Sequence, residues 1–112
     1  MTVRQIQIVA PTALPASLAT VATVPAATTY RIGRAGFSNP TNAAVTVSVY
    51  AVPSGGTAGP TNQLVDTISV AANSTYVSPE LAGFVMPPGT TLQAVASVAT
   101  SLVMYASGTS IN

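Results

Sequence analysis

Nine prolines are spread along the 112 residues of this chain and leave few windows long enough for a helix. They fall at positions 11, 15, 25, 40, 53, 60, 79, 87 and 88. Proline removes a backbone donor and clashes with the preceding helical turn, and the β-branched Val, Thr and Ile that dominate the intervening segments favour strands. The sequence therefore predicts an all-β chain.

The clearest strand pattern is AVTVSVYAV at 44–52, where Val45, Val47 and Val49 share one face. Seven further segments are strand candidates: VRQIQIV, TVATV, TTYRIGRAGF, LVDTISV, STYVS, TTLQAVASV and LVMYAS. About seven or eight short strands separated by turn residues predict an antiparallel β-sandwich, of either the jelly-roll or the immunoglobulin-like kind.

The stretch VPSGGTAGPTN at 52–62 raises the question of a phosphate-binding loop. Such a loop needs a lysine and a following helix. The chain contains no lysine, and the next residues, QLVDTISV, alternate as a strand does. We therefore expect a long turn at the end of a sheet.

Two other segments also have turn residues. Pro88-Gly89 suits the centre of a type II turn, and SNPTN at 38–42 suits a hairpin loop.

The N-terminal segment differs from the rest, because Pro11 and Pro15 resist both a helix and a central strand. We interpret residues 1–19 as an extended arm ahead of a β-sandwich domain at 20–112. Side chains of such an arm would contact a sister subunit or another neighbouring protein, and the candidate contact residues are Val3, Arg4, Ile6, Ile8 and Val9. The alternative is a first strand folded onto the chain's own sheet.

Only five side chains carry charge, namely Arg4, Arg31, Arg34, Asp66 and Glu80, which is 4% of the chain against about 25% in ordinary domains. Free soluble monomers rarely have so few charges. We expect polar uncharged side chains and neighbouring subunits to cover the surface instead. Three scattered arginines give no basic patch for nucleic acid, and no apolar run reaches the roughly 20 residues that span a bilayer.

The residues available for catalysis are few. Without histidine or lysine, no side chain can accept a proton from a serine nucleophile, and two carboxylates are too few for a hard metal ion. The sequence predicts no enzyme, no catalytic residue, no cofactor and no metal site. Asp66 is in phase with Ile68 and would face the core if its strand began early, paired with Arg31 or Arg34. Otherwise it lies in a solvated loop.

Residues 20–108 resemble the small all-β virion proteins of tailed bacteriophages, which include capsid decoration (cement) proteins and modules of head or tail fibres. The resemblance lies in the VPAATT strand entry, the VPSGGTAG hairpin end, and a corner before the penultimate strand. The corner residues are Leu81, Gly83, Val85, Pro88, Gly89 and Thr90.

The resemblance implies a structural protein that is made in the host cytoplasm and located on the virion surface. Its partners would be the major capsid protein or other virion proteins, and it would form a homo-oligomer, with a trimer favoured. A cement protein that stabilises the assembled head is the preferred reading. The alternative is a receptor-binding or adhesive module of a fibre, but the loops SNPTN and SGGTAGPTN lack the aromatic and acidic residues expected at an adhesive tip.

Overall fold

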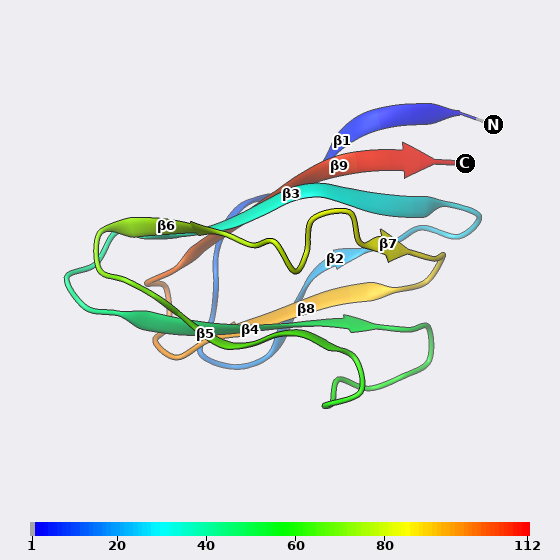
Figure 1. The fold of residues 1–112 in the computed structure, drawn as a ribbon. Helices are drawn as coiled ribbons and strands as arrows, with labels where there is room; N and C mark the ends of the chain where they lie inside the picture. Colours follow the sequence, from blue (N-terminus) through cyan, green and yellow to red (C-terminus); the bar gives the residue numbers. More distant parts are fainter. Residues whose placement is uncertain (1) are drawn as a thin grey trace.

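The computed structural model describes residues 2–112, and this range contains nine strands and no helix (Figure 1). The strands are β1 (Val3–Ala13), β2 (Ala19–Thr23), β3 (Thr29–Asn39), β4 (Val45–Val52), β5 (Gln63–Val70), β6 (Ser74–Val77), β7 (Val85–Met86), β8 (Thr91–Ala96) and β9 (Val103–Ile111). The prediction of an antiparallel β-sandwich is confirmed, with nine strands where the sequence suggested seven or eight.

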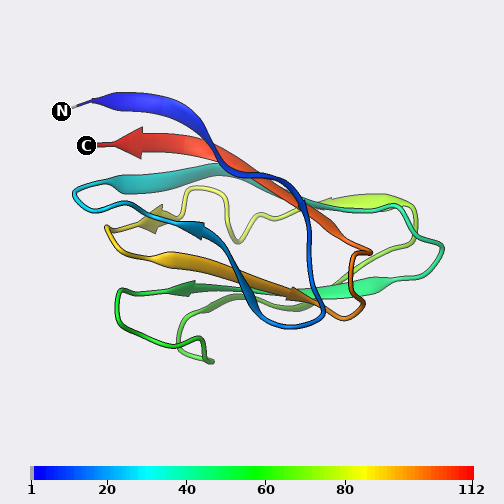
Figure 2. The same cartoon turned by 180° about the vertical axis from the view of Figure 1, so that it is seen from behind.

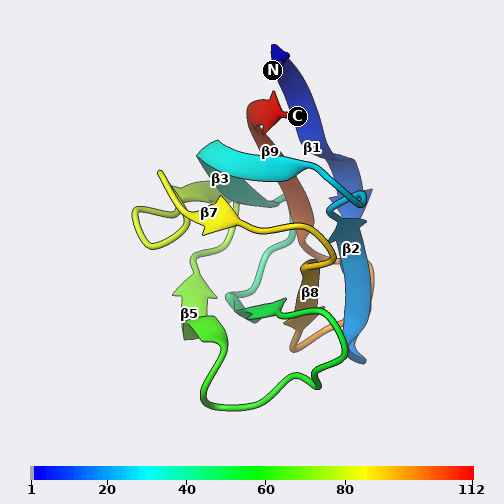
Figure 3. The same ribbon diagram turned by 90° about the vertical axis from the view of Figure 1, so that its right-hand side faces the viewer.

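The strands form two sheets that pack face to face. The five-stranded sheet has the order β1-β9-β3-β6, with β7 also paired to β3, and the four-stranded sheet has the order β2-β8-β4-β5. Viewed from the side, β1, β9, β3 and β7 occupy one layer and β2, β8 and β5 the other (Figure 3). The two termini lie side by side at one end, as the view from behind also shows (Figure 2).

The strand pairs are nested along the chain. The first strand pairs with β9, β2 with β8, β3 with β6 and β7, and β4 with β5. This is the pattern of one long antiparallel ribbon, and the additional pairs β3–β9 and β4–β8 form when that ribbon rolls up into two layers. Of the two architectures that the sequence allowed, the fold is therefore the jelly roll.

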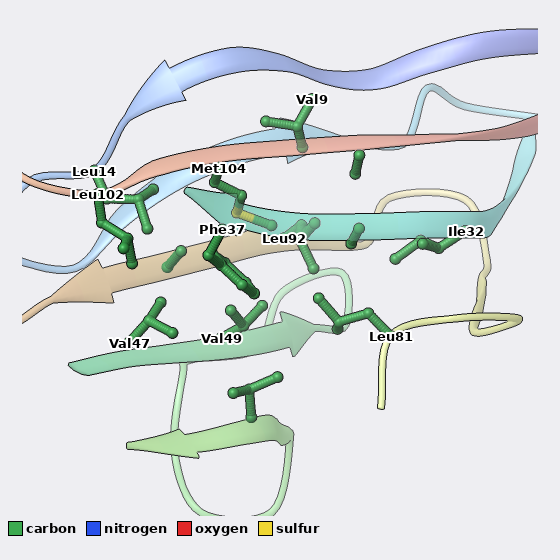
Figure 4. Close-up of a cluster of buried hydrophobic side chains, with 14 of the residues drawn as sticks. Val9, Leu14, Ile32, Phe37, Val47, Val49, Leu81, Leu92, Leu102 and Met104 are labelled. Atoms are coloured by element: carbon green, nitrogen blue, oxygen red, sulfur yellow. The ribbon is translucent and has the colours of Figure 1, made fainter. Parts of the chain in front are cut away.

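The core lies between the two sheets and is almost purely apolar. Phe37 and Met104 from the five-stranded sheet and Leu92 from the four-stranded sheet are fully buried and point toward one another (Figure 4). The alternation expected in 44–52 is confirmed, since Val45, Val47 and Val49 on β4 are buried while the residues between them are partly exposed.

The first strand belongs to this core. It pairs with β9 from Val3 to Ala13, and its Ile8 and Val9 lie in the same buried cluster as the side chains of the other strands, together with Leu14. The division into an arm at 1–19 and a body at 20–112 is therefore wrong, and the alternative of a first strand on the chain's own sheet is the observed structure. Pro11 is compatible with it because β1 is an edge strand.

Two turns follow the sequence expectations, but the prediction of a hairpin loop at SNPTN, 38–42, is wrong, because β3 and β4 lie in different sheets and this segment crosses between them. The glycine-rich stretch forms the β4–β5 connection, where Gly55 has a φ of 77° and the Asn62 side chain bonds backbone groups of Thr57 and Gly59 at 2.9 and 3.0 Å. Gly89 has a φ of 83°, and Thr90 N–H bonds the carbonyl of Pro87 at 3.2 Å, as a type II turn requires.

Candidate assembly surface

A β-sandwich has open sheet edges, and proteins that remain apart protect them with short strands, prolines, bulges or charges. The edges of the five-stranded sheet are β1 on one side and β6 with β7 on the other, and those of the four-stranded sheet are β2 and β5. These four edges are the natural places for another protein strand to add.

Three of the four edges are protected. The β6–β7 edge consists of strands of four and two residues, each closely followed by proline, at Pro79 and Pro87. The β2 edge is five residues long and irregular between Thr20 and Ala22. The β5 edge has a bulge, described below. Each of these devices interrupts the regular ladder that an added strand would need.

The fourth edge, β1, is eleven residues long, and its two halves differ. The C-terminal half contains Pro11 and two breaks in register, one between Gln7 and Val9 and one between Val9 and Thr12. The N-terminal half, Val3–Gln7, pairs with β9 in unbroken register from Ile111 to Ser107 and contains no proline. We call residues 3–7 of β1 the open edge.

The pairing with β9 fixes which backbone groups of the open edge are free. Thr2 and Asn112 exchange backbone hydrogen bonds, so in an antiparallel ladder the pairs Arg4–Ser110 and Ile6–Gly108 are the next hydrogen-bonded ones. The residues between them have their N–H and C=O groups directed away from β9. The open edge therefore presents the backbone donors and acceptors of Val3, Gln5 and Gln7.

The five predicted contact residues fall into two groups. Ile8 and Val9 are 8% and 2% exposed in the protein's own core, so they are not available for a neighbouring subunit. Val3 is 57% exposed and Arg4 is exposed, while Ile6 is half-buried and packs against the core. A contact role therefore stays a prediction for Val3, Arg4 and Ile6 only.

Sequence patterns alone do not indicate Gln5 and Gln7, which form the middle and the end of the open edge. Their polar side chains carry no hydrophobic signal, and the direction of a backbone N–H depends on the register with β9, more than 100 residues away in the chain. The clue in the sequence is that no proline interrupts positions 3 to 7, whereas Pro11 and Pro15 follow shortly after.

Asp66 lies in β5, yet it is exposed, so the prediction that it would face the core if the strand began early is wrong. Val49 pairs with Val65 while Val47 pairs with Ile68, which leaves Asp66 and Thr67 together in a bulge. Thr67 has a φ of 50°, and its hydroxyl donates to Asp66 Oδ1 at 2.9 Å. The bulge shifts the side-chain phase by one residue and directs the carboxylate to solvent.

Glu80 accepts more side-chain hydrogen bonds than Asp66, the other carboxylate of the chain. The hydroxyls of Tyr76 and Ser78 each donate to its Oε1 at 2.9 Å. The pKa of Glu80 lies below its usual value, because a hydrogen bond from its own backbone stabilises the ionised form and those hydroxyls add to it. The pKa of Tyr76 is raised, first by burial and then by its bond to Glu80.

The tyrosines do not form a stacking platform in the part of the chain that the structure describes. Tyr76 stacks on the core residue Phe37 at a centroid distance of 6.5 Å, Tyr30 packs against the core cluster, and Tyr50 accepts a bond from Gln63. These contacts are core and rim packing, and they do not leave the row of open ring faces that a sugar-binding platform would need.

Three depressions lie on the surface of residues 2–112. One of about 470 Å³ lies on the five-stranded sheet beside Gln5, Gln7 and Arg34, a polar one of about 280 Å³ lies beside Asn39 and Asn73, and an apolar one of about 300 Å³ is lined by Leu64 and Phe84 among others. Within residues 2–112, no three His, Cys, Asp or Glu side chains gather as a metal site would require. The same range holds no helix long and apolar enough to cross a membrane.

No protein-family model matches this chain, and no curated protein does either. Solved structures do match. A protein of Bacillus endospore appendages, described as disulfide-linked pili, gives a TM-score of 0.57 at 18% identity and covers 99% of this chain and 88% of that one. Chains of infectious bursal disease virus, from the Gx and Gt strains, each give a TM-score of 0.50 at 20% and 13% identity.

The two viral matches cover 97% of this chain but only 31% and 30% of the viral chains, so this protein corresponds to about a third of their length. At such low identities the likeness shows the fold alone, a jelly roll that also occurs in a pilus protein and in a virus. The pilus is described as disulfide-linked, whereas this chain has no cysteine.

Proposed function

We propose that this protein is a non-catalytic structural subunit of a virus particle, and specifically a decoration protein that binds and stabilises the assembled head of a tailed bacteriophage. The observation that carries the proposal is the small number of charged side chains for the area of the surface. A complete jelly roll exposes 5581 Å², and the whole chain has five charged side chains to solvate it. Such a surface suits a protein whose faces are covered by neighbours.

The positions of the charged side chains and their hydrogen-bond partners support a structural role. Arg31 and Arg34 share β3, whereas Arg4, Asp66 and Glu80 lie on β1, on β5 and between β6 and β7. The hydrogen bonds of Asp66 and Glu80 are to neutral side chains close in sequence. Neither carboxylate lines one of the three main depressions of the described surface. The groups available for contact with a neighbouring protein are hydroxyls, amides and the backbone of the sheet edges. Protein interfaces combine such hydrogen-bonding groups with complementary shape.

A decoration role is favoured over a fibre adhesin by the loops. The β3–β4 and β4–β5 connections hold Asn, Pro, Thr, Ser, Gly and Ala without any aromatic or acidic residue, so they offer no stacking surface for sugar rings and no charge for a receptor. The partner that fits this role is the major capsid protein, and the location is the outer surface of the virion.

Electron cryomicroscopy of particles recovered from the cells that make this chain tests the proposal. We expect a jelly-roll density matching residues 2–112 on the capsid shell, at a fixed number of copies per shell protein. Density of this fold at the tip of a fibre would favour the adhesin instead. Particles that contain no such density, in cells that make the protein abundantly, would contradict both roles.

A further inference from the structure

The open edge, residues 3–7 of β1, is regular and exposed and carries one charged side chain, Arg4, whereas the other three sheet edges in the described residues are short or interrupted. We propose that it is a self-association site. Two copies join their open edges antiparallel about a two-fold axis that passes beside Gln5, so that the five-stranded sheets become one continuous sheet. This inference concerns self-pairing and does not depend on the proposed location in a virion.

The free backbone groups restrict how two open edges can pair. In an antiparallel ladder, residues with outward groups must face residues with outward groups, so Val3, Gln5 and Gln7 pair among themselves. Successive registers then differ by a shift of two residues. Only the register with Gln5 opposite Gln5 of the second copy also places Val3 opposite Gln7, and so uses all three residues of each edge.

The neighbouring registers are disfavoured for separate reasons. Shifting the pairing toward the N-terminus places Arg4 directly opposite Arg4 of the second copy, and like charges in that position destabilise a sheet. Shifting it toward the C-terminus brings Val9 opposite Val3, and Val9 lies beyond the irregularity that follows Gln7. The repulsion between two Arg4 side chains and the irregularity after Gln7 in β1 together favour the register centred on Gln5.

In the selected register the side chains match. On the inner face, Arg4 lies opposite Ile6 of the second copy, where its aliphatic stem covers the half-buried isoleucine while the guanidinium reaches solvent. On the outer face, the two Gln5 amides face each other and can exchange hydrogen bonds. The edge is therefore complementary to itself, which is what a two-fold interface requires. This arrangement gives a dimer in place of the trimer that the family resemblance favours.

Single-cysteine variants test the register directly, since the protein has no cysteine of its own. In Gln5→Cys the two cysteines lie opposite each other, with Cα atoms about 5.5 Å apart, within the range of about 4.4–6.8 Å that disulfides span. Mild oxidation should convert most of the protein into a cross-linked dimer. The matched control is Gln7→Cys, whose cysteines lie four residues apart along the ladder, about 14 Å, and should not cross-link.

A mixture of Val3→Cys and Gln7→Cys proteins provides the complementary readout, because these positions face each other between copies. We expect a cross-linked heterodimer from the mixture and much less product from either variant alone. Equal cross-linking of Gln5→Cys and Gln7→Cys, or none in either, would overturn the proposal.

The variant Gln5→Pro tests the interface without a cross-link. The Gln5 N–H points away from β9, so proline removes a donor that only the dimer uses. Sedimentation equilibrium should show a dimer for the native protein and a dissociation constant at least tenfold higher for Gln5→Pro, with a circular dichroism spectrum that matches the native one. A native protein that is a monomer at tens of micromolar, or a trimer, would overturn the proposal. Should Gln5→Pro fail to fold, the cysteine variants still decide the matter.

Discussion

The side-chain amide of Asn39 donates a hydrogen bond to the backbone carbonyl of Val70 at 3.0 Å, and it joins the end of β3 in one sheet to the end of β5 in the other. The same amide group bonds the carbonyl of Ala43 at 2.9 Å, and its oxygen accepts the N–H of Thr41 at 3.0 Å. Asn39 is 1% exposed. One buried side chain therefore organises the corner where the chain crosses between the sheets.

Replacing Asn39 with alanine should destabilise the protein strongly, because the Val70 carbonyl and the Thr41 N–H lose their bonds to Asn39, and the Ala43 carbonyl keeps only its bond from the Thr41 hydroxyl. We expect the free energy of unfolding to fall by about 2–3 kcal/mol. The control is Asn42→Ala in the same loop, where the side chain is exposed and a change within about 0.5 kcal/mol is expected. Urea unfolding followed by circular dichroism measures both, and equal losses would show that the corner does not depend on Asn39.

A methyl group at Gly108 should also be poorly tolerated. A Cβ atom there would overlap the backbone carbonyl oxygen of Arg31 on the paired strand β3 and would lie 2.8 Å from Cδ1 of Ile8. The carbonyl oxygen of Arg31 belongs to the backbone and cannot rotate away, so β3 and β9 must move apart. We expect Gly108→Ala to lower the free energy of unfolding by at least about 1–3 kcal/mol. Gly59→Ala, with open space around its Cβ position, is the matched control and should melt near the native temperature.

The Glu80 carboxylate should make stability depend on pH in the acid range. Its pKa is lowered in the folded protein by hydrogen bonds from its own backbone and from Tyr76 and Ser78. A group with a depressed folded pKa contributes stability above its unfolded value of 4.5, and this contribution is lost as the pH falls through the folded pKa. The melting temperature of the native protein should therefore exceed that of Glu80→Gln more at pH 6 than at pH 3.

Because Glu80 is exposed, the expected difference is small, and paired melts in the same buffers are needed to resolve it. A gap between native protein and Glu80→Gln that stays constant from pH 6 to pH 3 would show that the ionised carboxylate does not stabilise the fold.

Much of the architecture could be predicted from local signals. The prolines exclude helices, the alternation in β4 fixes its buried face, and the Pro88-Gly89 turn follows from the conformations that these two residues adopt. The two-residue strand β7 has no such signal, because the Tyr30–Met86 and Arg31–Val85 pairs with β3 create it. The core-facing alternative for Asp66 failed because a bulge changes the phase of a strand without any mark in its composition, whereas the expectation of a solvated side chain agrees with its exposure.

The candidate site was harder to predict than the fold. The apolar residues of the N-terminal segment indicated an interface, but Ile8 and Val9 are apolar because they fill the protein's own core. Whether β1 returns to its own sheet depends on contacts with β9 at the opposite end of the chain, which local patterning does not record. Only the register between the two strands identifies Gln5 and Gln7 as the residues with free backbone groups.

We propose that this charge-poor jelly roll is a particle component held by apolar and backbone contacts. Sedimentation of purified particles through gradients that contain either about 0.05 M or about 0.5 M salt tests this claim, with the ratio of this protein to the shell protein measured in the particle band. With at most five charges available per copy, screening should matter little, so we predict the same ratio at both salt concentrations. Recovery of the folded protein at the top of the gradient, at either salt concentration, would contradict the claim.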